Sequence, residues 1–288
     1  MRRHGKRIVR TGRVLASRRA VWGAGLATVA LAGVVAATPG ALGAGRLAIR
    51  LAAAVKSLPR KAPVVPPALM HGRLYNGTPA VGALFKTSSG HLGQHFCSGS
   101  VVDSPAGDLV ITAAHCMQGW RPGGVDFVPE YHRGQQPFGA WTVTQVFVDR
   151  AWASSQNPDN DFAFLVVSQP GDTTSIQGLT GGEKLGTGWP PVRKVRVIGY
   201  PDGRQRPISC TSATRAFGPH QLEFDCGGYT DGTSGGPFLA NVHPATGLGT
   251  VIGVIGGYQQ GGDTPSVSYS ARFGSPVRAL YHKAVAKN

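Results

Sequence analysis

Acidic side chains are scarce in this chain, and the scarcity is uneven. The 288 residues hold 14 Asp and Glu against 29 Lys and Arg, a formal net charge of +15. No acidic residue precedes Asp103, and residues 1–61 contain 13 of the basic ones. The remainder therefore carries 29 − 13 = 16 basic and 14 acidic side chains, a net charge of +2. A nearly neutral folded part lacks the broad basic surface that binds DNA or RNA, so we expect no nucleic-acid partner.

Long apolar runs are also rare, and the most prominent one lies near the start. The Arg-rich residues 1–19 precede an apolar stretch over residues 20–37, with the small residues Val35-Ala36-Ala37 at its end. This order is typical of a cleaved export signal, which we assign to residues 1–44. Ser17-Arg18-Arg19 fits a twin-arginine or an ordinary Sec signal equally well. The competing interpretation is a retained membrane anchor, since a span needs about 17 residues.

The Gly and Ala content makes that stretch only weakly apolar, which favours cleavage over anchoring. We therefore expect a secreted, extracellular protein with no stable membrane association after signal cleavage. Residues 45–73 contain several basic residues and Pro63, Pro66 and Pro67, and we interpret them as a propeptide or linker. Residues 74–288 are enough for one domain with its own core.

Cysteines are few, and none has the Cys-x-x-Cys spacing of a typical structural zinc site. We expect no metal and no cofactor. The four cysteines are Cys97, Cys116, Cys210 and Cys226. An even number in an exported chain indicates two disulfides, for which the count alone allows three pairings.

Long amphipathic helical patterns are missing from most of the chain after residue 81. Short alternating or β-branched runs take their place, separated by Gly, Pro, Asn and Asp. The predicted strands are 81–86, 98–102, 109–112, 141–148, 162–167, 192–198, 221–224, 237–239, 250–254 and 267–270. A closing helix is expected over 276–286. Periodicity by itself predicts an all-β sandwich or barrel.

Three short motifs carry the residue types of nucleophilic catalysis. Ser234 lies in the glycine-rich stretch Asp231-Gly232-Thr233-Ser234-Gly235-Gly236-Pro237, and His115 follows Ile111-Thr112-Ala113-Ala114. Asp161 directly precedes the apolar run Phe162-Ala163-Phe164-Leu165, with Asp159 as its rival. A serine hydroxyl needs a base within hydrogen-bond reach, and a histidine base needs a carboxylate to fix its tautomer. The order along the chain is His, Asp, Ser.

These motifs resemble those of the chymotrypsin-like (trypsin-like) serine proteases, over about residues 81–281. Within that family they look most like the secreted bacterial branch that includes the glutamyl endopeptidases. The resemblance implies an all-β fold of two antiparallel six-stranded β-barrels, with the active site in the cleft between them and a short C-terminal helix. It also implies the disulfides Cys97–Cys116 and Cys210–Cys226.

The resemblance assigns a role to each residue of the motifs. His115 would act as general base and acid, Asp161 would orient it, and Ser234 would form an acyl-enzyme. The backbone N–H groups of Gly232 and Ser234 would form the oxyanion hole. The expected substrate-binding residues are Gly228, Tyr229, Gly256, Gly257, Tyr258 and Val267.

The chain departs from the family at three positions. Thr233 replaces the aspartate that binds the new N-terminus of trypsin-like zymogens, so activation through that ion pair is not expected. Gly228 replaces the acidic pocket floor, and the stretch 253–258 lacks the histidine of glutamyl endopeptidases. Preference for Arg, Lys or Glu is therefore unsupported. With Val267 projecting into it, we expect a shallow apolar pocket that accepts uncharged side chains.

The expected function is that of a monomeric, secreted serine endopeptidase acting on polypeptides. One alternative is a non-catalytic exported binding domain on the same fold, against which the complete triad argues. The other is a serine esterase, which would normally show the order Ser, Asp, His and a Gly-x-Ser-x-Gly elbow.

Overall fold

A computed structural model of the chain describes residues 69–171 and 174–287. All described residues belong to one compact unit within Val64–Asn288. The predicted export signal and most of the predicted propeptide or linker lie outside the described residues. Within the part described, no helix has both the length and the hydropathy to cross a membrane.

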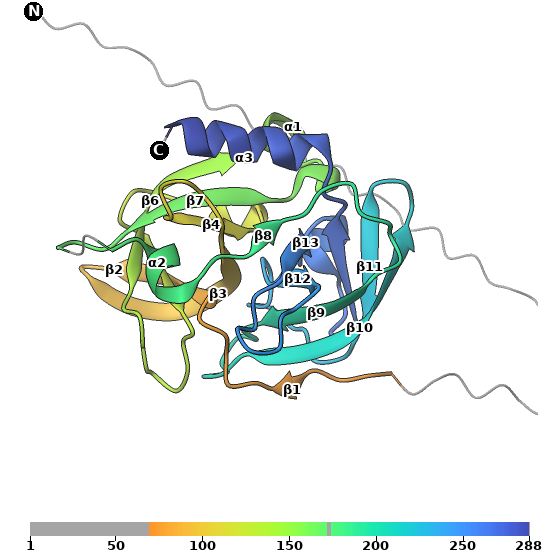
Figure 1. Cartoon of the computed structure of the whole chain (residues 1–288), viewed down its shortest axis with the longest axis horizontal. Helices are drawn as coiled ribbons and strands as arrows, with labels where there is room; N and C mark the ends of the chain where they lie inside the picture. The colour runs from red at the N-terminus through yellow and green to blue at the C-terminus, as the bar shows by residue number, and fades with distance from the viewer. Residues whose placement is uncertain (1–68, 172–173, 288) are drawn as a thin grey trace, which may run out of the picture. The chain divides into compact units, whose positions relative to one another are not determined.

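The first half of the domain is a closed barrel of six antiparallel strands in the order β2-β3-β4-β7-β6-β5 (Figure 1). Buried Leu84, Val101 and Phe127 pack in one of its apolar clusters. The hairpin between the first two strands turns at Ser89 and Gly90, both at positive φ, which suits the twist of a two-residue hairpin loop. The strands are β2 (Val81–Ser88), β3 (His91–Val102), β4 (Leu109–Thr112), β5 (Val125–Pro129), β6 (Trp141–Val148) and β7 (Ala163–Ser168).

The second half is an eight-stranded sheet in the order β14-β11-β10-β9-β12-β13-β8, with β1 added on β10. Six of its strands form the expected second barrel, and two strands of two residues each extend it. Val197, Phe224 and Phe238 are among the buried residues of its core. The strands are β1 (Arg73–Leu74), β8 (Lys184–Leu185), β9 (Lys194–Gly199), β10 (Ile208–Phe217), β11 (Gln221–Asp225), β12 (Pro237–Ala240), β13 (Thr250–Val254) and β14 (Val267–Ala271).

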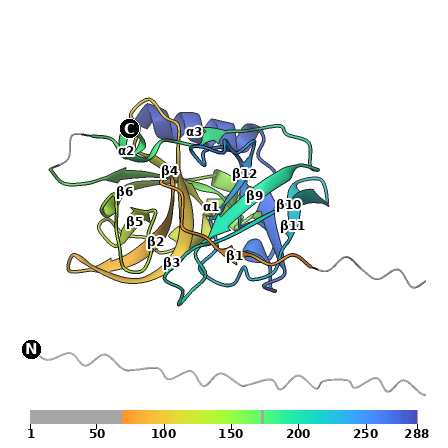
Figure 2. The same cartoon turned by 60° about the horizontal axis from the view of Figure 1, so that its bottom comes forward.

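Both ends of the described chain pack on the barrels. The C-terminal helix α3 (Ser275–Lys287) buries Val277, Leu280 and Ala284 and contacts β6 and β7 of the first barrel (Figure 2). Strand β1 pairs with β10 of the second barrel. The remaining helical segments are α1 (Arg150–Ser155), α2 (Ile176–Thr180), η1 (His115–Met117), η2 (Pro158–Asn160) and η3 (Tyr258–Gly261).

Two disulfides are present, with the predicted pairing. Cys97 on β3 is bonded to Cys116 on η1, within the first barrel. Cys210 on β10 is bonded to Cys226, which directly follows β11, within the second. Each bond therefore closes a loop inside one barrel, and the described residues contain no free cysteine.

Candidate active site

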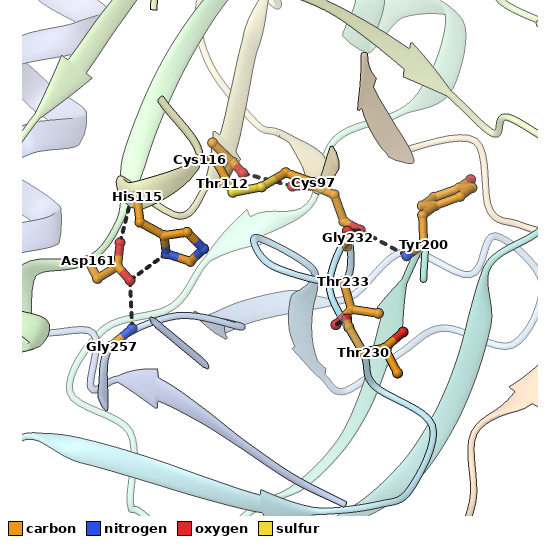
Figure 3. The surroundings of a disulfide bond; sticks show 11 residues. Cys97, Thr112, His115, Cys116, Asp161, Tyr200, Thr230, Gly232, Thr233 and Gly257 are labelled. Carbon is orange, nitrogen blue, oxygen red and sulfur yellow. Dashed lines mark hydrogen bonds and ion pairs between the residues drawn. A yellow bond between two sulfur atoms is a disulfide. The ribbon is translucent and has the colours of Figure 1, made fainter. Parts of the chain in front are cut away.

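His115 and Asp161 are held against each other at the edge of the first barrel. His115 opens η1 directly after β4, and Asp161 lies just before β7, the neighbour of β4. The His115 Nδ1 lies 2.7 Å from Asp161 Oδ2, and the His115 backbone N–H donates to Asp161 Oδ1 at 2.9 Å (Figure 3). The carboxylate thus fixes the ring orientation, and a proton on Nδ1 leaves Nε2 as an acceptor.

The Asp161 side chain is completely buried, whereas the His115 side chain is 10% exposed. A third hydrogen bond reaches the carboxylate from the second barrel, because Gly257 N–H donates to Asp161 Oδ2 at 2.8 Å (Figure 3). A buried carboxylate needs such partners, since burial without them is costly. Asp159 is only partly buried and accepts a hydrogen bond from Gln221 instead.

Ser234 lies in a turn that leads into β12 of the second barrel. Gly232, two residues earlier, has φ +86°, and a Cβ there would lie 2.4 Å from Asp202 Oδ1 and 2.6 Å from Tyr200 O. Only glycine fits this backbone. Among the described residues, the N–H groups of Gly232 and Ser234 have no hydrogen-bond partner. Two such donors on one turn can receive a developing oxyanion.

A cleft of about 920 Å³ joins the two barrels at this place. His115 and Ser234 both line it, from the first and the second barrel respectively. Its other lining residues include Lys86, Phe96, Gln118, Asp202, Tyr229, Thr230, Asp231, Gly232, Thr233, Ile255, Gln259, Gln260, Gly261, Gly262, Asp263, Thr264, Pro265 and Ser268. The described residues thus place His115 and Ser234 in one open groove.

The comparisons with known proteins agree with this geometry. Residues 73–273, more than half of the chain, match the family model described as trypsin. The chain belongs to the trypsin family. No curated protein sequence matches it.

Solved structures of trypsin-like fold align with most of this chain. The protease Anisep from Arthrobacter nicotinovorans is 24% identical, with a TM-score of 0.62 over 75% of this chain and 99% of its own. The thermostable serine protease AL20 from an extremophilic microorganism is 25% identical, with a TM-score of 0.62 over 73% and 99%. A Glu endopeptidase is 14% identical, with a TM-score of 0.58 over 75% and 97%, which supports the fold alone.

Thr233 gives this member of the trypsin family a neutral residue beside Ser234. Its hydroxyl donates to Thr230 O at 2.7 Å, and its side chain is buried. The turn is therefore closed by a local hydrogen bond in which no ionised group takes part.

Only part of the predicted substrate-binding set lines this cleft. The cleft is lined by Tyr229 but, among the described residues, not by Gly228 or Val267. Ser268 lines it instead, because β14 turns Ser268 and Ser270 inward. Val267 is therefore not among the described residues that line this cleft, and the shallow apolar pocket stays a prediction.

Gly256, Gly257 and Tyr258 are also absent from the described lining of the cleft. The Gly256 N–H donates to Tyr269 O and the Gly257 N–H to Asp161, so neither of these two N–H groups is free to donate to a substrate. Tyr258 stacks on Phe217 and Tyr269.

The sequence did not predict that the residues directly after Tyr258 line the cleft. Gln259 and Gln260 line the cleft with φ of 51° and 53°, a left-handed conformation that non-glycine residues rarely adopt. Neither residue type signals such a turn. The one group of potential metal ligands found among the described residues is Cys97, His115 and Cys116, and its two sulfurs are already joined in a disulfide.

Proposed function

We propose that this protein is a serine endopeptidase that cleaves polypeptides through an acyl-enzyme on Ser234. The observation that carries the proposal is the commitment of His115 Nδ1 to Asp161 within the cleft that Ser234 also lines. That arrangement frees His115 Nε2 to take the proton as Ser234 Oγ attacks a peptide carbonyl. The Gly232 and Ser234 N–H groups then bind the resulting oxyanion.

The two halves of the reaction use the same groups in opposite directions. His115, now protonated, gives its proton to the departing amine as the C–N bond breaks. Water then enters, loses a proton to His115 and attacks the acyl carbonyl. Ser234 recovers its proton when the ester bond breaks, which releases the acid product. Membership of the trypsin family and the likeness to a serine protease support this chemistry.

For the residue before the cleaved bond, we propose an uncharged side chain. Thr230, Thr264, Pro265 and Ser268 offer the cleft hydroxyls and apolar atoms but no fixed charge. Asp263, a carboxylate of the same lining, already accepts a hydrogen bond from Gln259. A charged substrate side chain beside these four residues would lose water without an ionic partner among them, which is costly. Lys86, Asp202 and Asp231 also line the cleft, so a strong preference for a charged side chain in a peptide-library digest would contradict this proposal.

We further propose that the protein is secreted and acts as a monomer. The Arg-rich start, the apolar stretch after it and the two disulfides support export, because disulfides persist in oxidising compartments. Mass spectrometry of the protein recovered outside the producing cell would identify the cleavage sites, and recovery only as a full-length intracellular chain would contradict secretion.

The test of the catalytic proposal pairs two reagents. A fluorophosphonate probe should label the protein on Ser234, and a peptide library should be cut with a defined preference. Ser234→Ala should abolish labelling and lower turnover by several orders of magnitude with the fold intact. Absence of labelling would indicate a binding domain on this fold. Labelling with hydrolysis of esters but of no peptide would indicate an esterase.

A further inference from the structure

Ser98 connects the first barrel to the turn that carries Ser234. It is fully buried on β3, directly after Cys97. Its N–H donates to Ser234 O at 2.7 Å. Its hydroxyl donates to Gly232 O at 3.0 Å and accepts from the Tyr200 N–H at 2.9 Å. One buried residue therefore binds the carbonyl groups of both residues whose N–H groups face the proposed oxyanion.

The Ser98 hydroxyl donates one hydrogen bond and accepts another. A hydroxyl has a single donor proton, and this one points to Gly232 O while the oxygen accepts from Tyr200. Thr112 on β4 donates its own hydroxyl to Ser98 O at 2.7 Å, which fixes the backbone as well. Three of these partners, Thr112, Gly232 and Tyr200, are drawn in Figure 3. Ser98 is thus held by its own barrel and cannot follow a movement of the turn.

We propose that Ser98 is a positioning residue of the oxyanion hole, an inference that rests on the proposed function. The N–H groups of Gly232 and Ser234 have no partner of their own among the described residues, and Asp231 O, which shares a peptide unit with the Gly232 N–H, accepts from the Asp202 N–H at 2.7 Å. Peptide units are planar, so a held carbonyl fixes the N–H group of the next residue. Ser98 thereby holds the units Gly232 O–Thr233 N and Ser234 O–Gly235 N, on either side of the unit that carries the Ser234 N–H. Gly232 has the wide conformational freedom of glycine, which makes the anchor on its carbonyl necessary.

The neutral residues of the turn support this role. Thr233 closes the turn on Thr230 without an ion pair, so no buried charge stabilises the geometry of the turn. The hydroxyl of Ser98 then provides the hydrogen bond between the two barrels that sets Gly232. Ser98 acts through the backbone of the turn and does not itself touch the oxyanion.

The experiment compares Ser98→Ala with Ser100→Ala. Ser100 is equally buried and lies on the same face of β3, but its hydroxyl reaches only Val101 O at 3.5 Å. For Ser98→Ala we expect kcat on a peptide substrate to fall about tenfold to a hundredfold while KM stays within about twofold, because a buried carbonyl and N–H lose their partner. For Ser100→Ala we expect both constants to stay near those of the wild type.

A second readout separates positioning from general weakening of the fold. A peptide aldehyde forms an oxyanion in the hole, so Ser98→Ala should weaken its binding by the same factor as kcat. Binding of the corresponding uncleaved peptide to the Ser234→Ala background should not change. Equal effects of Ser98→Ala and Ser100→Ala, or a loss in KM alone, would overturn the inference.

Failure of the role proposed for Ser98 can be told apart from failure of the proposed function. A wild-type protein that neither reacts with a fluorophosphonate nor cuts peptides would contradict the function itself. If Ser98→Ala does not fold, Thr112→Val tests the same anchor from β4, since it removes the bond to Ser98 O. We expect Thr112→Val to lower kcat several-fold at constant KM, and an unchanged kcat would overturn the role of Ser98.

Discussion

Glu183 should make the stability of this protein fall as the pH rises. Its side chain is fully buried, Oε2 accepts a hydrogen bond from the Gly249 N–H, and Oε1 has no partner among the described residues. Burial raises the pKa of this carboxyl from 4.5 to about 7, an effect that the Gly249 hydrogen bond only partly offsets. A folded protein that binds a proton more tightly than the unfolded chain is stabilised at low pH.

The magnitude follows from the size of the shift. A rise of about 2.5 pKa units corresponds to about 3 kcal/mol at 1.36 kcal/mol per unit. This contribution is fully present below pH 4.5 and is lost as the pH rises through 7. Glu183→Gln keeps the shape of the side chain and cannot ionise. The free energy of unfolding of the wild type relative to this variant should therefore fall by about 3 kcal/mol between pH 4.5 and pH 8.

Urea unfolding followed by tryptophan fluorescence would measure the difference at each pH. Both proteins should carry Ser234→Ala, which prevents self-digestion during the scan. Glu130→Gln is the control, because that carboxyl is partly exposed and should change the pH dependence less. A difference between wild type and Glu183→Gln that stays flat from pH 4.5 to pH 8, or that grows, would refute the argument.

The remaining predictions concern the site and its supports. Peptide hydrolysis should rise with pH as His115 loses its proton, because only the neutral imidazole accepts the Ser234 proton, and a rate that is flat across acid to mildly alkaline pH would exclude His115 as base. Gly232→Ala should lower kcat by about 10²–10³ and also lower the urea midpoint, because at this positive φ the added Cβ would meet Tyr200 O at 2.6 Å and displace an oxyanion donor. Wild-type turnover in that variant would contradict the assignment. Replacing Cys210 and Cys226 together by Ser should cost about 3 kcal/mol in denaturant unfolding, since the bond closes a loop of sequence separation 16. An unchanged midpoint would show that the loop is held by other contacts.

The sequence predicts the barrels well where a strand alternates or is β-branched. The expected 250–254 and 141–148 coincide with β13 and β6. Strand β10 was missed because Ser209, Thr211 and Ser212 interrupt its apolar pattern, and its exposure alternates only in part. Pairing to β9 and β11 on its two sides, which a local pattern does not contain, makes it a strand.

Local sequence also failed to predict which side chains of β14 face the interior. On β14 the pattern Val267-Ser268-Tyr269-Ser270 suggests that the large residues face inward. The structure reverses this, because Tyr269 stacks on Phe217 and Tyr258 outside the barrel and leaves the serines inside. A contact among three separate segments decides the register, and no single strand predicts it. The proximity of His115 and Asp161 could be predicted, since a short motif marks each residue.

Each end of the described chain packs on the barrel that is farther from it along the sequence. Strand β1 precedes the first barrel yet pairs with β10 of the second, while α3 follows the second barrel yet lies on β6 and β7 of the first. Neither disulfide links the barrels, so β1 and α3 hold them together by non-covalent contacts. Any separation of the two barrels would break the pairing of β1 with β10 or the contacts of α3 with β6 and β7. Because His115 and Ser234 lie on opposite barrels, the packing of the two chain ends also keeps the two sides of the cleft aligned.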